Sequence, residues 1–118
     1  MIRRTSPYGG ILHEVVEHQG VLYFGGMVSE DLSLDMGGQA RDVFRQLDLL
    51  LGQHGSDKTK ILSALVFVSD LALKSAFNEE WKSYFAAEHL PARAAVQVGG
   101  LGEDVLLEIV FTAAVRSR

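Results

Sequence analysis

Two segments of the chain carry hydrophobic residues at the alternating three- and four-residue spacing of an amphipathic helix. They span residues 35–53 and 70–88. Gly55 follows the first segment as a stop signal, Asp70 is a suitable N-cap for the second, and Pro91 lies soon after its end. We therefore predict two amphipathic helices over these ranges.

Five further segments have the length and the apolar composition of β-strands. Residues 61–68 and 105–115 are apolar at successive positions, which is typical of strands buried on both faces. Residues 12–17 and 21–24 flank a short polar turn and predict a hairpin, and residues 92–98 alternate in character along a fifth strand. The order β-β-α-β-α-β-β predicts an α+β fold whose two helices act as crossovers.

One face of the predicted sheet has no helix to cover it. Five or six strands make a sheet roughly 25–29 Å wide, and two helices about 10 Å across cover most of one face only. Residues 61–68 and 105–111 are nevertheless apolar on both sides, in a chain that is 47% hydrophobic. We therefore predict a single domain over residues 1–118 that buries its second sheet face in a homo-oligomer.

Composition and charge exclude several classes of protein. The 118 residues include 11 Lys and Arg against 15 Asp and Glu, so a net charge of −4 argues against nucleic-acid binding. No apolar run approaches the roughly 20 residues of a membrane helix, and the N-terminus lacks the apolar core of a signal peptide. The absence of cysteine excludes thiolate metal sites and suits the cytoplasm. The four histidines show no metal-ligand spacing, so we expect no metal site.

Two charged residues interrupt the predicted strands. Arg93 shares a strand face with Ala95 and Gln97, so its guanidinium needs either a protein acid or an anionic ligand as its partner. Glu108 lies in an otherwise apolar run and is the nearest candidate acid. A structural Arg93–Glu108 ion pair is one interpretation. The other is a site in which the carboxylate activates a water molecule.

Weaker signals come from glycine and aromatic residues. Gly25 and Gly26 follow a strand, where they predict either a bulge or tight turn, or a backbone that a ligand can approach closely. Tyr8 falls in a predicted loop, where it either packs at an interface or lines a site. Trp81 and Phe85 have helical spacing and are predicted to be core residues.

The motifs of the chain, taken in order, resemble those of one protein family, the RidA (YjgF) family of reactive-intermediate deaminases. The resemblance covers nearly the whole chain, and its most specific part is Pro-Ala-Arg followed by a Glu fifteen residues after the arginine. The residues that carry it are Ser6-Pro7-Tyr8, Gly25-Gly26, Gly38-Gln39-Ala40-Arg41, Phe67-Val68-Ser69-Asp70, Phe77-Asn78, Pro91-Ala92-Arg93 and Leu107-Glu108-Ile109.

The resemblance implies a chorismate-mutase-like subunit in a homotrimer with clefts between subunits. It also implies hydrolysis of enamines and imines such as 2-aminoacrylate to 2-keto acids and ammonia, without metal or cofactor. By position, Arg93 would clamp the substrate carboxylate and Glu108 would orient the attacking water. Tyr8 would line the cleft, and Gly26 and the backbone of Ala95 would contact the substrate.

Four positions in three segments depart from the family pattern and bear on substrate preference. The usual Ser-Gly-Gln is here Gly25-Gly26-Met27, a frequent Cys is Ala95, and a common second Glu is Val110. Two other functions stay open. One is a non-catalytic, regulatory trimer that binds a carboxylate metabolite in the same cleft. The other is cleavage of single-stranded RNA, which the charge of −4 disfavours.

Overall fold

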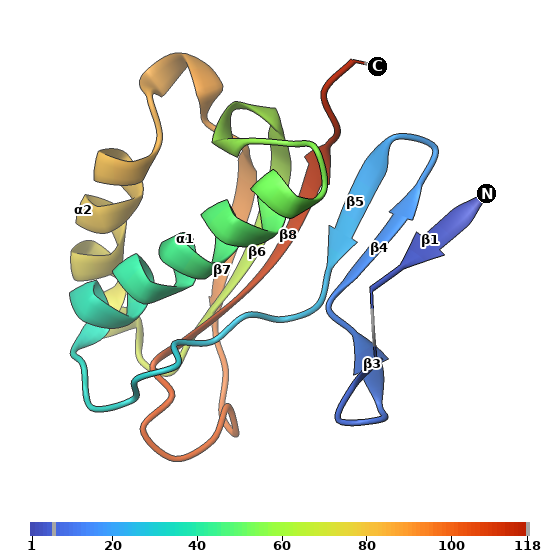
Figure 1. The fold of residues 1–118 in the computed structure, drawn as a ribbon. Helices are drawn as coiled ribbons and strands as arrows, with labels where there is room; N and C mark the ends of the chain where they lie inside the picture. The colour runs from blue at the N-terminus through green and yellow to red at the C-terminus, as the bar shows by residue number, and fades with distance from the viewer. Residues whose placement is uncertain (6, 118) are drawn as a thin grey trace.

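The computed structural model describes residues 1–5 and 7–117, which form one mixed sheet, a separate two-stranded hairpin and two α-helices (Figure 1). The helices are α1 (Met36–Gln53) and α2 (Lys74–Tyr84), with 3-10 turns η1 (Lys58–Lys60), η2 (Leu71–Leu73) and η3 (Ala87–His89). The strands are β1 (Ile2–Arg4), β2 (Pro7–Tyr8), β3 (Leu12–His13), β4 (Val15–His18), β5 (Val21–Phe24), β6 (Ile61–Val68), β7 (Ala92–Gln97) and β8 (Leu107–Ala114). The predicted α+β class is confirmed.

The six-stranded sheet has the order β1-β4-β5-β8-β6-β7. β6 and β7 run parallel with α2 as their crossover, and the other neighbouring pairs are antiparallel. The predicted hairpin is present as β4 and β5, joined by Gln19 and Gly20, whose φ angles of 51° and 77° suit the tight turn of a twisted hairpin. Both β1 and β7 are edge strands.

The predicted strand over residues 12–17 is divided in the structure. Leu12–His13 pairs with Pro7–Tyr8 in the small hairpin, and the main sheet begins only at Val15. Gly9 and Gly10 turn the small hairpin with φ angles of 60° and 69°, a conformation that L side chains rarely adopt. Residues 12–17 contain no Gly or Pro, so the sequence contains no sign of a change of sheet at this point.

The two helices differ in how well their ends follow the sequence pattern. α1 begins where predicted, because the Asp35 carboxylate accepts a hydrogen bond from the Gly38 N–H at 2.9 Å. α2 is shorter than predicted. Asp70 caps η2 by accepting from Ala72 N–H, and Phe85 leaves the helix in an extended conformation. Its ring then packs 4.6 Å from the ring of Trp81, so core packing ends α2 before the apolar periodicity does.

Both helices pack on the same face of the sheet, as Figure 1 shows, and the hydrophobic core lies between the helices and the sheet. The predicted core residues Trp81 and Phe85 are 6% and 4% exposed there. The opposite face carries Tyr23, Leu65 and Val96, which are 50%, 41% and 41% exposed. The predicted uncovered, apolar sheet face is therefore present in the single chain.

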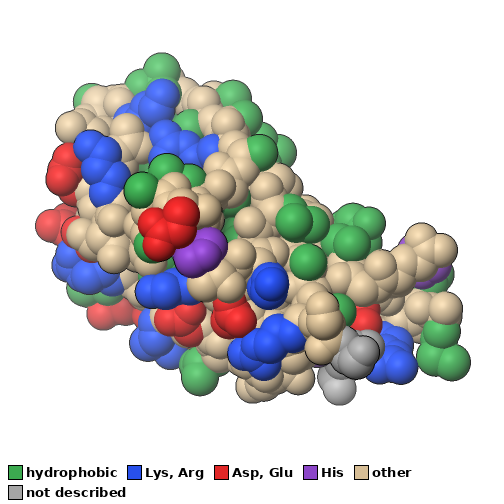
Figure 2. All heavy atoms as spheres, turned by 90° about the horizontal axis from the view of Figure 1, so that it is seen from above, with side chains coloured by type: hydrophobic (Ala, Val, Ile, Leu, Met, Phe, Trp, Pro, Cys, Tyr) green, Lys and Arg blue, Asp and Glu red, His purple; other side chains and the backbone are tan. Residues whose placement is uncertain are grey.

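The molecule is flat, with extents of 41 × 38 × 20 Å. Figure 2 shows acidic and basic side chains interspersed over the broad end of the molecule and hydrophobic side chains clustered toward the narrow end. Within residues 1–5 and 7–117, no helix has the length and hydropathy needed to cross a bilayer.

Candidate functional site

Arg93 lies on the helix face of β7 and stacks on aromatic rings. Its guanidinium carbon is 4.9 Å from the centre of the Trp81 ring and 5.5 Å from the centre of the Phe77 ring. Burial lowers the pKa of Arg93 below its ordinary value. In the part of the chain that the structure describes, no carboxylate lies within ion-pair distance of this side chain. The N–H donors of Arg93 therefore have no carboxylate partner among these residues.

Glu108 lies on the opposite face of the sheet. Arg93 is in register with Ala64, which pairs with Phe111, whereas Glu108 pairs with Phe67. An offset of three residues reverses the side of the sheet, because side chains alternate with a period of two. The Cα atoms of Arg93 and Glu108 are about 14 Å apart, because two strand spacings and three residues along the strands separate them. The interpretation of an Arg93–Glu108 ion pair within one chain is therefore wrong.

Glu108 does lie against Gly26. A Cβ atom on Gly26 would stand 2.9 Å from the carboxyl carbon of Glu108 and would overlap one of its oxygens. Met27 exchanges backbone hydrogen bonds of 2.9 and 3.0 Å with Ile109, which holds the two segments side by side. Only glycine fits at position 26 with this carboxylate in place.

A β-bulge also occurs next to Gly26. Tyr23 pairs with Thr112, and Met27 bridges to Ile109. The four residue steps from Tyr23 to Met27 therefore lie opposite only three steps from Thr112 to Ile109, which defines a bulge. The interpretation of Gly25 and Gly26 as a bulge is thus confirmed, whereas close approach of a ligand to this backbone stays a prediction.

A cleft of about 300 Å³ opens beside Gly26. It is lined by the β2–β3 hairpin, residues 25–30 and two side chains of α1. Tyr8, which is 62% exposed, enters the cleft from the hairpin, which projects from the sheet at the label β3 in Figure 1. The structure thus brings together Tyr8 and Gly26, with Glu108 against Gly26.

Ala95 lies two residues after Arg93 on the edge strand β7. The Val98 N–H donates to the Val68 carbonyl on β6 at 3.0 Å. Because N–H and C=O groups alternate sides along a strand, those of Arg93 and Ala95 point to the free edge of the sheet. The five predicted site residues therefore form two separate groups: Tyr8, Gly26 and Glu108 in one, and Arg93 and Ala95 in the other.

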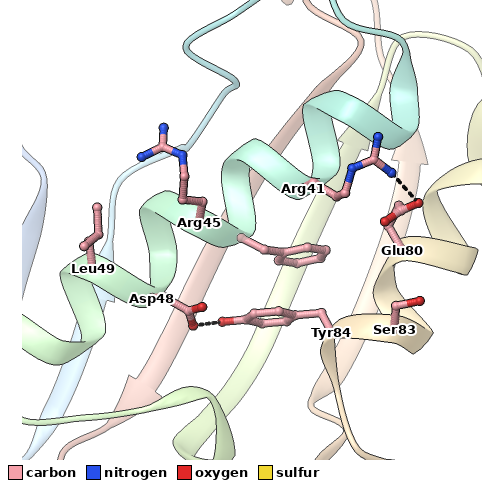
Figure 3. Close-up of a pocket in the computed structure, with 8 residues that line it drawn as sticks. Arg41, Arg45, Asp48, Leu49, Glu80, Ser83 and Tyr84 are labelled. Atoms are coloured by element: carbon pink, nitrogen blue, oxygen red, sulfur yellow. Dashed lines mark hydrogen bonds and ion pairs between the residues drawn. The ribbon is translucent and has the colours of Figure 1, made fainter.

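A wider groove of about 690 Å³ lies between α1 and α2 and contains none of these residues. Figure 3 shows the Tyr84 hydroxyl pointing at Asp48, to which it donates at 2.5 Å, and Arg41 reaching Glu80 at 2.8 Å. Burial, together with the neighbouring Asp48, raises the pKa of Tyr84 above its ordinary value. The charged groups of this groove are largely satisfied by one another, so we assign it no chemistry.

The sequence led us to expect Arg93, Glu108 and Tyr8 in the candidate site, but not the two rings that support Arg93. Phe77 and Trp81 are core residues, as their helical spacing predicts, and their ring faces also support Arg93. Helical periodicity shows which face of a helix is buried but not what the buried rings contact. Arg93, on strand β7, was the only feature of the sequence that could have pointed to these ring contacts.

The mixed sheet with two helices on one face defines the class of the protein, an α+β subunit with a YjgF-like fold. The family model described as Endoribonuclease L-PSP matches residues 2–115. The RutC family protein YoaB of Escherichia coli is 36% identical over 102 residues, which are 86% of this chain and 89% of that protein.

Solved structures agree with this match. A member of the YjgF family from Neisseria meningitidis is 30% identical, with a TM-score of 0.93 over 100% of this chain and 98% of that chain. A protein of the Rid family from Yersinia pestis is 28% identical, with a TM-score of 0.83 over 90% of this chain and 89% of that chain. The chain belongs to the Endoribonuclease L-PSP family, which confirms the resemblance to RidA (YjgF) proteins.

Proposed function

We propose that the protein hydrolyses reactive enamines and imines of 2-amino acids, such as 2-aminoacrylate, to 2-keto acids and ammonia. The observation that carries this proposal is the guanidinium of Arg93, which is held on two rings with no acid beside it among residues 1–5 and 7–117. A planar guanidinium matches a carboxylate through two parallel hydrogen bonds, and every substrate of this class carries a carboxylate. Membership of the Rid and RutC group of proteins supports a deaminase-type role.

The active site would be shared between copies of the chain. Arg93 and Glu108 point to opposite faces of one sheet, so one chain cannot offer both to the same small molecule. We expect a homotrimer in which the apolar sheet faces meet. Tyr8, Gly26 and Glu108 of one copy would then face Arg93 and Ala95 of the next across each cleft.

The reaction needs only binding and proton transfer. An enamine first takes a proton from solvent on carbon and becomes the protonated imine, which is already electrophilic at carbon. Arg93 holds the substrate carboxylate, with the outward backbone groups of Ala95 beside it. Glu108 takes a proton from water as its oxygen bonds to that carbon and the C=N π electrons pass to nitrogen. Glu108 then passes this proton to nitrogen. The C–N bond breaks as the hydroxyl oxygen forms the C=O bond and returns its proton to Glu108, and the 2-keto acid and ammonia leave.

In the test, a pyridoxal-phosphate-dependent dehydratase generates 2-aminoacrylate from serine, and the rate of pyruvate release is measured. We expect the wild type to accelerate release and Arg93→Ala to lower kcat/KM roughly 100-fold or more, because two hydrogen bonds to a charged group are lost. Arg41→Ala is the matched control, since Arg41 is an exposed arginine in the groove between the helices. A wild type that matches buffer for imines of alanine, 2-aminobutyrate and leucine would rule the proposal out.

One observation favours a second function, the binding of a carboxylate metabolite without turnover. Arg93 alone provides a carboxylate site at the edge of β7, and that site does not depend on Glu108 reaching it from another copy. Saturable binding of a 2-keto acid that Arg93→Ala abolishes, with no imine hydrolysis, would select this function.

Cleavage of RNA has less support. The net charge is −4, and Figure 2 shows acidic side chains interspersed with the basic ones over the face in view. Proteins that grip single-stranded RNA use a continuous basic groove with stacking aromatic side chains. Absent or salt-independent binding of RNA would dismiss this activity.

A further inference from the structure

The indole of Trp81 is the support on which the Arg93 guanidinium rests. Trp81 is 6% exposed and Phe77 is fully buried, and the two rings lie 5.8 Å apart at an angle of 53°. The rings of Phe85 and Phe44 lie 4.6 and 6.3 Å from that of Trp81 on the core side. The indole is therefore fixed by the packing of the core, whether or not a ligand is present.

A guanidinium over an aromatic face differs in one respect from a guanidinium in an ion pair. The ring attracts the cation through its π-face, whereas a carboxylate would occupy the N–H donors at the rim. With rings beneath it and no acid within reach among the described residues, Arg93 keeps both its charge and its donors for a ligand. Aromatic support thus orients the cation without neutralising it.

We infer that Trp81 is a positioning residue that holds Arg93 ready for the carboxylate of the ligand. This inference rests on the proposed function for the class of ligand. Trp81 does not touch the reacting atoms, so its loss weakens carboxylate binding and leaves the chemical step nearly unchanged. Without the indole, the Arg93 side chain becomes ordered only when the ligand binds, and the entropic cost of ordering it raises KM.

The kinetic test compares three variants. We expect Trp81→Leu to raise KM about 3- to 10-fold, the usual cost of ordering one flexible side chain on binding, with kcat within about twofold of the wild type. Trp81→Phe retains a ring and is expected to recover most of the loss. Phe85→Leu is the matched control, because Phe85 is 4% exposed and contacts Trp81 but makes no ring contact with Arg93. Thermal melts verify that each variant is folded.

A binding test separates this inference from the proposed function. Trp81 is the only tryptophan of the chain, so the intrinsic fluorescence of the wild type should change as 2-oxobutyrate saturates the site, and Arg93→Ala should abolish the change. Calorimetry with 2-oxobutyrate then gives the affinity of each Trp81 variant. Binding that weakens in Trp81→Leu in a protein without imine hydrolysis would support the inference while the proposed function fails.

Three results would overturn the inference. One is equal affinity for 2-oxobutyrate, and equal KM where turnover is seen, in Trp81→Leu and the wild type. A second is an equal loss in Phe85→Leu, which would make the effect one of core packing. The third is a wild type that binds no 2-oxobutyrate, since Trp81 would then have no carboxylate site to prepare.

Discussion

At the scale of single residues, the site depends on two unusual neighbourhoods. Arg93 is supported by rings where an acid would be expected, and Gly26 is small because a carboxylate occupies the space of its missing Cβ. Neither neighbourhood follows from residue type alone. Each arises because a second strand or helix brings its partner alongside.

Gly26→Ala tests the second neighbourhood. The added methyl would overlap the carboxylate of Glu108 and force that side chain away. If Glu108 handles the water, we expect kcat to fall roughly 10-fold or more, the range for a displaced general base, with a smaller change in KM.

Gly99→Ala is the control for Gly26→Ala. A Cβ at Gly99 would meet no atom within 4 Å, and its backbone does not have a positive φ. We expect it to retain wild-type kinetics. A Gly26→Ala enzyme with unchanged kcat would show that Glu108 has room to move, or that it is not the base.

At the scale of elements, Gln39 joins three segments at one end of the sheet. Its side chain is fully buried, and its Nε2 donates to the carbonyls of Leu34 at 3.1 Å and Asp104 at 3.0 Å. Its Oε1 accepts from the N–H of Leu106 at 3.1 Å. One amide thus satisfies three backbone groups and fixes the connection from β7 to β8, the two strands that carry Arg93 and Glu108.

We expect Gln39→Leu to lower the free energy of unfolding by about 2–4 kcal/mol, because it removes the hydrogen-bond partner of three backbone groups. Urea unfolding followed by circular dichroism measures this loss. Gln53→Leu, at the exposed end of α1, should change the free energy by less than about 0.5 kcal/mol. Equal effects of the two substitutions would contradict the role given to Gln39.

The same scale shows what sequence patterns can predict. The ends of α1 follow from capping, and the limits of β6 follow from an apolar run in which Ser63 is the one polar residue. The end of α2 and the break after Leu12–His13 do not, because core packing and a change of sheet override the local periodicity. The sequence suggested candidate site residues but not the sheet faces on which Arg93 and Glu108 lie, since strand register is set by pairing between distant segments.

At the scale of the whole molecule, the uncovered sheet face is the main unpartnered surface that we identify. Leu65 lies on this face on β6, with exposed Val96 on the neighbouring strand β7 and exposed Tyr23 two strands away on β5. Burying such a face requires a large partner, and a further copy of the chain carries a matching apolar surface.

We expect light scattering to give a trimer for the wild type and a monomer for Leu65→Arg, because an unpaired charge is costly within an apolar interface. Imine hydrolysis should be lost with the trimer. Leu49→Arg is the control, since Leu49 is 58% exposed on the outer side of α1. A monomeric wild type, or dissociation caused equally by Leu49→Arg, would contradict the proposed assembly.

The free edge of β7 has a consequence for the lone subunit. An edge strand with outward backbone groups can pair with any exposed strand, and the apolar sheet face beside it adds a second adhesive surface. A subunit released by dilution or heat would therefore be prone to aggregate and slow to rejoin its former partners. In such a protein, solubility and activity would be lost together when the chains separate.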